Sequence, residues 1–399
     1  MKTILVRFVK AVILLFLVVI FQAIPSCRSE SKFQDFQNII DRISIKWVPD
    51  QREGIAGLTV HKQAEKIIIK GETNCPQLIM EVLDSLSAKG YEVIDSVLVL
   101  PGNDVGEYKY GIATLSVINL RREPEHSAEL VSQSILGTPV KVLKNSGYWI
   151  LVQTPDKYIA WSEKVSFQLM NEAEFNEWKN ARKVIYIENT GWIYESIEEK
   201  GVIGDIVAGS IMKSGGKSGS WEKVILPDGR EGYVRGKTVV NYCDWKNRLT
   251  ADGPAVLRIA SSLMGIPYLW GGSSSKGVDC SGFAQTAYFM NGIILSRDAS
   301  LLALHGQPVD ISDGWNNLNT GDLMFFGSIR NSKPRVTHVA IYKGDSEFIH
   351  SAGRVMVNSL DSTRSNYSSY RRNSFLSARR ISGSVSIPGI VAVRDHELY

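Results

Sequence analysis

The 399-residue chain has few cysteines, no marked excess of charge of one sign and, after its first residues, no long apolar run. Four cysteines are too few for a scaffold held together by disulfides. Lys and Arg number 45 against 41 Asp and Glu, which excludes a general nucleic-acid binder because such proteins carry a strong basic excess. With 44% apolar and 22% charged residues, a disordered or fibrous protein is excluded as well. The length predicts two to four domains.

Residues 1–26 have the features of a signal peptide. Three basic residues, Lys2, Arg7 and Lys10, precede an apolar run over 11–21 that is too short to span a bilayer alone. The following Ile24-Pro25-Ser26-Cys27 resembles a bacterial lipobox. We therefore expect cleavage before Cys27, lipidation of its thiol, and a membrane-anchored protein of the cell envelope that faces the periplasm. Ordinary signal cleavage and an uncleaved anchor remain alternatives.

Residues 33–110 are expected to form a small α/β domain. Short strands are predicted over 55–61, 66–70 and 93–100, and a helix over 76–89 that Gly90 ends. The segment has no catalytic constellation, so its role is predicted to be structural or in binding a partner.

Residues 111–170 and 183–243 consist of short apolar stretches separated by turn signals, which predicts two small β-barrels in tandem. The first resembles bacterial SH3-like domains in three stretches: Leu120-Arg121, Leu136-Gly137-Thr138-Pro139-Val140 and Tyr158-Ile159-Ala160-Trp161. The second unit is less typical of these domains.

Cys280 stands at the predicted start of a helix. Asp279 is a good N-cap residue, and the segment after Cys280 has helical composition as far as Gly292. A thiol in the first turn feels the positive end of the helix dipole, which favours the thiolate. The thiolate attacks carbonyl groups, so this placement predicts a cysteine nucleophile.

Two histidines are predicted to lie side by side on a β-hairpin. Residues 336–342 and 347–352 have strand composition and are joined by a short polar turn, and they contain His338 and His350. Alternation along a strand places His338 on the face opposite to Val339 and Ile341. One imidazole could take the thiol proton while the other fixes its tautomer, as in a catalytic triad.

Six motifs occur in a fixed order along residues 254–385. They are Tyr268-Leu-Trp270-Gly271-Gly272, Asp279-Cys280-Ser281-Gly282-Phe283, Ser296-Arg297-Asp298-Ala299-Ser300, Gly321-Asp322-Leu323-Met324-Phe325-Phe326, Thr337-His338-Val339-Ala340-Ile341-Tyr342 and Phe348-Ile349-His350-Ser351-Ala352-Gly353. Together they resemble the NlpC/P60 family of cell-wall cysteine peptidases. The upstream barrels resemble those of family members that cleave γ-D-glutamyl-diamino-acid bonds.

The resemblance implies an α+β, papain-like catalytic domain that follows two SH3-like barrels and a small α/β unit. It implies Cys280 as nucleophile, His338 as base, His350 as the orienting residue and Tyr268 at the oxyanion site.

The residues expected at the substrate are Asp279, Ser281, Trp270 and Ser300 in the catalytic domain, and Glu129 and Tyr158 in the first barrel. Glu129, Tyr158 and Asp279 would meet a free L-Ala amine. No cofactor and no metal are implied. Ser296 departs from the family pattern, which usually has proline there.

Several side chains admit a second interpretation. Cys280, His338 and His350 could bind zinc, but no second short-spaced ligand pair accompanies them. Cys75 and Cys243 could form a disulfide or be two free buried thiols. The arginines at 371, 372, 379 and 380 are expected to form a solvated face, or more weakly to attract anionic wall polymers.

The leading functional hypothesis is a monomeric cysteine peptidase. It would hydrolyse the γ-D-Glu–diamino acid bond of peptidoglycan stem peptides or muropeptides through a thioester, with a free N-terminal L-Ala required. A muramoyl-L-alanine amidase or D,D-endopeptidase on the same scaffold is the alternative enzyme. A wall-binding adaptor with an inert catalytic domain is the non-enzymatic alternative, which the intact Cys-His-His set argues against.

Overall fold

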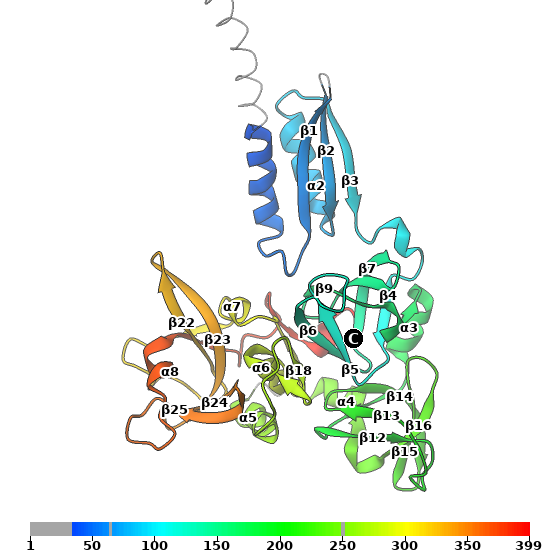
Figure 1. The fold of residues 1–399 in the computed structure, drawn as a ribbon, viewed down its shortest axis with the longest axis vertical. Helices are drawn as coiled ribbons and strands as arrows, with labels where there is room; N and C mark the ends of the chain where they lie inside the picture. The colour runs from blue at the N-terminus through cyan, green and yellow to red at the C-terminus, as the bar shows by residue number, and fades with distance from the viewer. Residues whose placement is uncertain (1–33, 64–65, 249–251) are drawn as a thin grey trace, which may run out of the picture. The chain divides into compact units, whose positions relative to one another are not determined.

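The computed structural model describes residues 34–63, 66–248 and 252–399 and divides the chain into two compact units (Figure 1). The first unit ends at Gly102 and the second covers Asn103–Tyr399. The boundary therefore lies before the position near 110 that the sequence suggested, because Val105 already packs in the core of the first barrel. In the described part of the chain, no helix combines the length and apolar character needed to cross a membrane.

The first unit is a three-stranded sheet covered by two helices. Its elements are β1 (Ala56–Gln63), β2 (Lys66–Thr73), α2 (Pro76–Ser87), β3 (Val93–Val99) and a helix described over residues 34–47. β1 and β2 are antiparallel, whereas β2 and β3 are parallel because α2 forms the crossover between them. Ile67 and Ile69 alternate toward one face and pack against Leu78 and Val82 of α2. This unit matches the strands and the helix that the sequence predicts.

The second unit begins with two barrels, each made from one seven-stranded sheet. Barrel 1 contains β4 (Tyr110–Ala113), β5 (Val117–Arg121), β6 (Leu130–Ile135), β7 (Pro139–Ser146), β8 (Trp149–Gln153), β9 (Ile159–Glu163) and β10 (Phe167–Met170). Barrel 2 contains β11 (Lys183–Tyr186), β12 (Thr190–Tyr194), β13 (Val202–Val207), β14 (Ile211–Ser218), β15 (Trp221–Ile225), β16 (Glu231–Arg235) and β17 (Val239–Asn241).

Short helical turns connect and flank the barrels. They are η1 (Asn103–Val105), η2 (Lys164–Ser166), α3 (Glu172–Asn180), η3 (Gly236–Thr238) and α4 (Tyr242–Asn247). Leu136, at the turn between β6 and β7, leaves its own barrel and packs in the core of barrel 2. The barrels are therefore packed against each other through buried apolar contact.

The catalytic domain packs helices on one six-stranded antiparallel sheet of order β21-β26-β22-β23-β24-β25. Its helices are α5 (Gly253–Ser262), α6 (Cys280–Phe289), α7 (Ala299–Leu302), α8 (Ser369–Ser374) and the short η4 (Val393–Asp395). Its strands are β18 (Ser273–Ser274), β19 (Gly277–Val278), β20 (Ile293–Leu295), β21 (Gln307–Val309), β22 (Leu323–Arg330), β23 (Lys333–Gly344), β24 (Glu347–Ala352), β25 (Arg354–Ser359), β26 (Phe375–Arg380) and β27 (Ile390–Ala392).

Helix α6 packs on β23 and β24, and this contact brings the start of the helix to the two histidine-bearing strands. Phe283 and Ala287 of α6 share a core with Val339, Ile341 and Ile349 of the sheet. The antiparallel β23–β24 hairpin that the sequence predicts is confirmed by the pairing of Ile341 with Ile349. The predicted α+β class is also confirmed.

Candidate active site

Cys280 is the first residue of α6, and Asp279 caps that helix. The Asp279 Oδ1 accepts a hydrogen bond from the Gly282 N–H at 2.7 Å, as expected for an N-cap carboxylate. Gly282 must lack a side chain, because a Cβ there would lie 2.0 Å from the Gly272 carbonyl oxygen. The helix start is therefore pressed against the loop that carries Tyr268 and Trp270.

The thiol of Cys280 is buried, and this changes its predicted ionisation. Burial and the Asp279 carboxylate raise the pKa of Cys280 to about 11. The backbone N–H groups of Val339 and Ser281 lower it, but by less. Cys280 stands at the helix start as predicted, and the N–H of Ser281 lowers the pKa of the thiol as expected, but the net shift is upward. The reason is that desolvation outweighs the helix-terminal N–H groups. A thiol of this kind needs a base.

The two histidines form a relay with an asparagine that the sequence did not point to. His338 Nε2 lies 2.7 Å from His350 Nδ1, and His350 Nε2 lies 2.9 Å from Asn358 Oδ1. Asn358 Nδ2 in turn donates to the Asn366 carbonyl oxygen at 3.0 Å. The relay runs from β23 to β24 and β25, and then to the loop after β25.

This relay fixes the protons on both imidazole rings. The Asn366 carbonyl oxygen can only accept, so the Asn358 amide must donate to it and present its own oxygen to His350. His350 Nε2 then carries a proton, and its Nδ1 accepts from His338 Nε2. His338 Nδ1 is consequently left with a lone pair. That nitrogen can take a proton from a thiol.

Both imidazole rings are kept neutral by their surroundings. Burial lowers the pKa of His338 well below its usual value, and the positive charge of Arg371 acts in the same direction. Burial also lowers the pKa of His350 to about 4, although its bond to Asn358 opposes the shift. The thiol and the imidazole are therefore both neutral at rest. The thiol lies at the strand that carries His338, because the backbone of Val339, the next residue, hydrogen-bonds to it.

Tyr268 lies on the loop that precedes α6. Its N–H donates to the Gly353 carbonyl oxygen at 2.9 Å, and it forms a bridge to Val278, two residues before the thiol. Burial and the neighbouring Cys280 raise the pKa of Tyr268 to about 12. The phenol therefore keeps its proton and can donate a hydrogen bond to an oxyanion.

Asp279 belongs to a buried ion pair that extends to barrel 1. The guanidinium of Arg297 contacts both carboxylate oxygens, with Nη2 at 2.6 Å from Oδ2. Arg297 also donates to Ser281 Oγ at 2.9 Å and to Ser132 Oγ of β6 at 3.0 Å. Burial opposes the charge on Arg297, but the Asp279 carboxylate outweighs it and raises the pKa of the guanidinium. Asp279 and Ser281 are thus already engaged with Arg297.

Ser296, which departs from the family pattern, makes a contact that proline could not. Its backbone N–H donates to the Gly389 carbonyl oxygen at 3.1 Å. Proline has no N–H, so this bond depends on the replacement.

Barrel 1 reaches the catalytic loop through Glu129. Trp270 Nε1 donates to Glu129 Oε1 at 2.9 Å, and Arg122 Nη2 lies 2.8 Å from Glu129 Oε2. Gly271 has a positive φ of 75°, and a Cβ there would meet the Leu130 carbonyl at 2.5 Å, so glycine permits this close approach. Of the expected ligand residues in barrel 1, Glu129 is partly exposed, whereas Tyr158 is buried in the barrel core. Ser300 lies in α7 and is partly buried.

The remaining sequence predictions have different outcomes. Cys27 lies outside the described residues. Cys75 and Cys243 are free thiols in the structure, and Cys243 is exposed rather than buried. Within the described ranges, no three His, Cys, Asp or Glu side chains converge as metal ligands. The short bond between His338 and His350 also occupies one ring nitrogen of each.

The expectation that the four arginines form a solvated face holds for Arg372, which is exposed, but not for the other three, which are partly buried. Arg380 forms an ion pair with buried Asp322 at 2.7 Å, and Arg379 donates from Nε to the Ala303 carbonyl at 2.9 Å. The guanidinium of Arg371 lies 5.6 Å from the centre of the Phe326 ring, and that ring packs against His338. Arg371 therefore lies beside the histidine pair.

Sequence reasoning missed three residues of this site: Arg297, Asn358 and Arg371. Arg297 had a usable signal, because a carboxylate predicted beside a buried thiol needs a cationic partner. Asn358 and Arg371 follow the last motif and have no local pattern that marks them. They could be found only once the strands had been placed.

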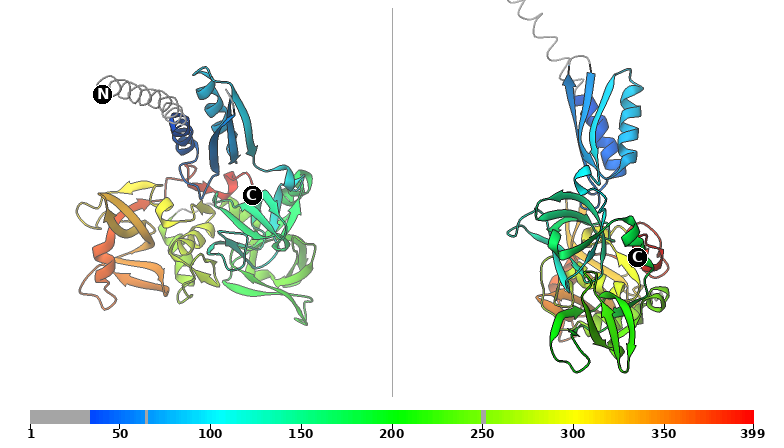
Figure 2. Two further views of the ribbon diagram at one scale, coloured as in Figure 1. Left: turned by 45° about the horizontal axis from the view of Figure 1, so that its top comes forward. Right: turned by 90° about the vertical axis from the view of Figure 1, so that its right-hand side faces the viewer.

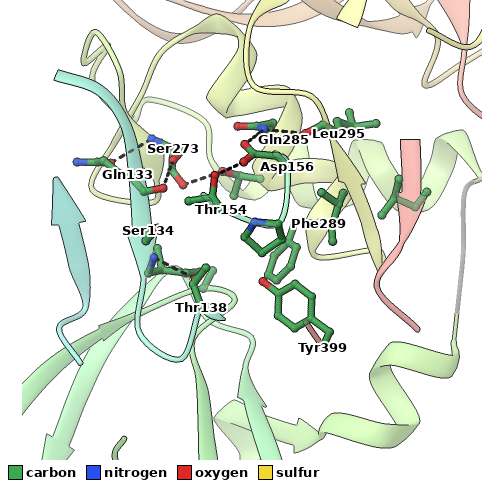
Figure 3. Close-up of a pocket in the computed structure, with 16 residues that line it drawn as sticks. Gln133, Ser134, Thr138, Thr154, Asp156, Ser273, Gln285, Phe289, Leu295 and Tyr399 are labelled. Carbon is green, nitrogen blue, oxygen red and sulfur yellow. Dashed lines mark hydrogen bonds between the residues drawn. The ribbon is translucent and has the colours of Figure 1, made fainter. Parts of the chain in front are cut away.

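A cavity behind α6 lies where barrel 1, barrel 2 and the catalytic domain meet (Figure 3). Gln285 of α6 donates from Nε2 to Asp156 Oδ2 of barrel 1 at 2.9 Å and to the Leu295 carbonyl at 2.8 Å. The buried ring of Tyr399 closes one side of the cavity. The histidine pair does not line this cavity. The cavity marks the junction that fixes barrel 1 to the helix that begins with Cys280.

Comparisons with known proteins agree with this architecture. The NlpC/P60 family profile matches residues 265–380, and the bacterial dipeptidyl-peptidase Sh3 domain matches residues 120–163. Over 261 residues the chain is 30% identical to "Dipeptidyl-peptidase 6" of Lysinibacillus sphaericus, which covers 63% of this chain and 91% of the relative. Over 231 residues it is 29% identical to "Gamma-D-glutamyl-L-lysine dipeptidyl-peptidase" of Bacillus cereus, which covers 56% of this chain and 67% of the relative.

A solved structure supports the same fold. The crystal structure of an NlpC/P60 family protein from Bacillus cereus matches with a TM-score of 0.59 and 22% identity, and covers 68% of this chain and 99% of that one. The predicted fold of SH3-like barrels before an NlpC/P60 domain is thereby confirmed. The match to the family profile, the extent of the relatives and the shared fold lead to one conclusion: the chain belongs to the NlpC/P60 family of peptidases.

Proposed function

We propose that this protein hydrolyses the γ-D-Glu–diamino acid bond of peptidoglycan stem peptides that have a free N-terminal L-Ala. The observation that carries the proposal is the His338–His350–Asn358 relay, which leaves one ring nitrogen of His338 free to act as a base toward Cys280. Relatives named for γ-D-glutamyl-L-lysine dipeptidyl-peptidase activity support the choice of bond.

In the first step, the thiol of Cys280 attacks the γ-carbonyl carbon of D-Glu. His338 Nδ1 accepts the thiol proton as the S–C bond forms, because the thiol does not ionise alone at neutral pH. The carbonyl oxygen becomes an oxyanion. The Tyr268 hydroxyl and a backbone N–H beside Cys280 donate hydrogen bonds to it.

The tetrahedral intermediate then expels the diamino acid. Its α-amine leaves with the proton held by His338, and L-Ala-γ-D-Glu remains as a thioester on Cys280. A water molecule gives its proton to His338 and attacks the thioester, which releases the dipeptide and restores the thiol. Asn358 holds His350, and His350 holds His338, so the same nitrogen serves in both steps.

The free amine of L-Ala is recognised by Glu129 of barrel 1. Asp279 is already neutralised by Arg297, so Glu129 rather than Asp279 is the carboxylate that can exchange its present cation, Arg122, for a substrate ammonium. Trp270 holds the Glu129 carboxylate at the cleft. This assignment replaces the expectation that two carboxylates share the ammonium.

The proposal is tested with defined peptides and mass spectrometry. We expect L-Ala-γ-D-Glu-L-Lys or its diaminopimelate counterpart to yield L-Ala-γ-D-Glu and the free diamino acid. Cys280→Ala should abolish the reaction while the protein keeps its thermal unfolding transition. Cleavage between the muramoyl group and L-Ala, which releases the stem peptide, would assign the chain to an amidase, and cleavage of D,D cross-links would assign it to a D,D-endopeptidase.

We further propose that the protein is exported, acts as a monomer and is anchored to the membrane by lipid on Cys27. The apolar run followed by Ile-Pro-Ser-Cys supports the anchor, and a single chain supplies every residue of the site. One acyl chain binds membranes only marginally, whereas several hold firmly. Cys27→Ser should release the protein from membrane fractions, and light scattering of the released form should give the monomer mass. Retention of the variant in membranes would contradict the lipid anchor.

A further inference from the structure

Two arginines affect the charge near Cys280, and their partners differ. Arg297 is 1% exposed and is neutralised by Asp279 at 2.6 Å. Arg371, in α8, is only partly buried, and within the described ranges no carboxylate forms an ion pair with it. Its guanidinium lies instead on aromatic rings, 5.6 Å from the centre of Phe326 and 5.2 Å from that of Tyr370.

The position of Arg371 disfavours the protonated form of His338. Its guanidinium lies 5.6 Å from the centre of the Phe326 ring, and that centre is 5.9 Å from that of His338. Burial lowers the pKa of Arg371, and its charge contributes to the lowered pKa values of His338 and His350. The proposed reaction places a proton on His338, so this cation opposes the charge that the base must acquire. A bound anion would remove that opposition.

The proposed substrate carries carboxylates on both sides of the scissile bond. Because D-Glu is linked through its γ-carboxyl, its α-carboxylate is free and lies a few bonds from the attacked carbonyl. In a tripeptide that ends at the diamino acid, that residue has a free α-carboxylate as well. An ordinary α-peptide has no free carboxylate at the first of these places.

Opposite charges lie on two sides of the catalytic domain, as they do along the substrate. Glu129, bonded to Trp270, provides a carboxylate on the side of barrel 1. α8 contacts β22 and lies across the catalytic domain from barrel 1 (Figures 1 and 2). A peptide with its ammonium at Glu129 would extend past Cys280 toward Arg371.

We infer that Arg371 binds a substrate carboxylate beside the scissile bond and is a specificity-determining residue for γ-linked D-Glu peptides. This inference rests on the proposed function. Binding neutralises the guanidinium next to His338, so the correct substrate makes its own general base easier to protonate. A peptide that lacks the carboxylate loses both the contact and this assistance.

The test compares three peptides: L-Ala-γ-D-Glu-L-Lys, the same peptide with the D-Glu α-carboxyl as carboxamide, and the same peptide with the Lys α-carboxyl as carboxamide. We expect the native protein to prefer one carboxylate over its carboxamide by about tenfold or more in kcat/KM, since Arg–carboxylate bonds are charge-assisted and this one is partly exposed. The peptide that loses activity identifies which carboxylate is bound.

Arg371→Ala should abolish that preference by slowing only the carboxylate peptide, and Arg371→Lys should restore part of it. Arg372→Ala is the matched control, because its guanidinium is 5.5 Å from the Trp315 ring, and it should leave the preference unchanged. With the carboxamide peptide, Arg371→Ala should also move the acid limb of the rate to higher pH. That shift reports the charge of Arg371 next to His338, whereas the lost preference reports its contact with the substrate carboxylate.

Binding to the Cys280→Ala protein separates this inference from the proposed function. If that protein binds the carboxylate peptide more tightly only when Arg371 is present, the inference stands even where no hydrolysis occurs. Equal binding of carboxylate and carboxamide peptides, or an equal loss on all three peptides in Arg371→Ala, overturns it.

Discussion

Barrel 1 and barrel 2 have the same topology strand for strand. The order β10-β4-β7-β8-β9-β5-β6 of barrel 1 corresponds to β17-β11-β14-β15-β16-β12-β13 of barrel 2. Both have a β-bulge in the corresponding strand pair, β7–β8 in one and β14–β15 in the other. In each, a short 3-10 turn precedes the last strand.

The barrels differ in which part of the catalytic domain they contact. Barrel 1 meets residues next to the nucleophile: Glu129 bonds Trp270, Ser132 bonds Arg297, and Gln133 bonds Ser273 and Ser274. Barrel 2 meets the segments that precede α6, where Asn189 donates to the Ser262 carbonyl and Asp205 pairs with Lys276. Two copies of one fold thus serve different roles, because the role depends on edge and loop residues rather than on the barrel.

The largest expected difference between the two junctions is in stability. Arg297→Met should cost about 3–5 kcal/mol of unfolding free energy, because it leaves the buried Asp279 carboxylate without its cation. Lys276→Met, which breaks the partly exposed pair with Asp205, should cost under about 1 kcal/mol. The difference in cost follows from the exposed fractions of the side chains. They are 1% for Arg297 and 9% for Asp279, but 44% for Lys276 and 37% for Asp205. Arg297 and Asp279 both belong to the catalytic domain, and Arg297 reaches barrel 1 through its bond to Ser132. Urea unfolding measures both losses, and equal losses would contradict the difference in burial between the two ion pairs.

The next effect is on activity. Glu129→Gln should lower kcat/KM for free-amine peptides by about tenfold, because it removes a partly exposed partner of the ammonium. The matched control is Glu199→Gln in barrel 2, since Glu199 is equally exposed, at 38%, and also pairs with an arginine. The control should leave the rate unchanged. If intact muramoyl peptides and free-amine peptides react equally fast with the native protein, barrel 1 is not a specificity element.

The pH dependence should come from the catalytic domain rather than from the barrels. His338 and His350 are buried with lowered pKa values, whereas His126 of barrel 1 is exposed. Below about pH 6.5 these histidines are protonated in the unfolded chain but stay neutral in the folded protein. The free energy of unfolding therefore falls as the pH drops through that value. Activity should persist below pH 6.5, because His338 stays neutral there. Thermal unfolding and initial rates from pH 4 to 8 measure the two; an acid limb at or above pH 6.5 would argue against the neutral pair.

The smallest effect is expected at Arg122, which pairs with Glu129 in the unbound protein. Arg122→Ala should lower KM for free-amine peptides about two- to fivefold, because the substrate ammonium no longer has to displace an exposed arginine. The corresponding change in barrel 2, Arg235→Ala, should have no effect on KM. An increase in KM in Arg122→Ala would mean that this arginine helps to bind the substrate.

The local parts of the site could be predicted from the sequence. The cap at Asp279, the helix that begins at Cys280 and the hairpin that carries His338 and His350 depend on signals a few residues apart. The neutral state of the thiol could not be predicted in this way. It depends on burial, and the core that buries Cys280 comes from several distant segments.

By itself the sequence predicted the helix that begins at Cys280, the hairpin that carries His338 and His350, and the fold of SH3-like barrels before an NlpC/P60 domain, because short-range capping and alternation signals and the family motifs carry that information. Only the tertiary structure decided that Asn358 ends the relay, that Arg297 neutralises Asp279 and that Arg371 lies beside the histidine pair. The physical reason is that each of these contacts joins side chains from different strands, helices or loops. Strand pairing and core packing, rather than any local pattern, set which of these side chains meet.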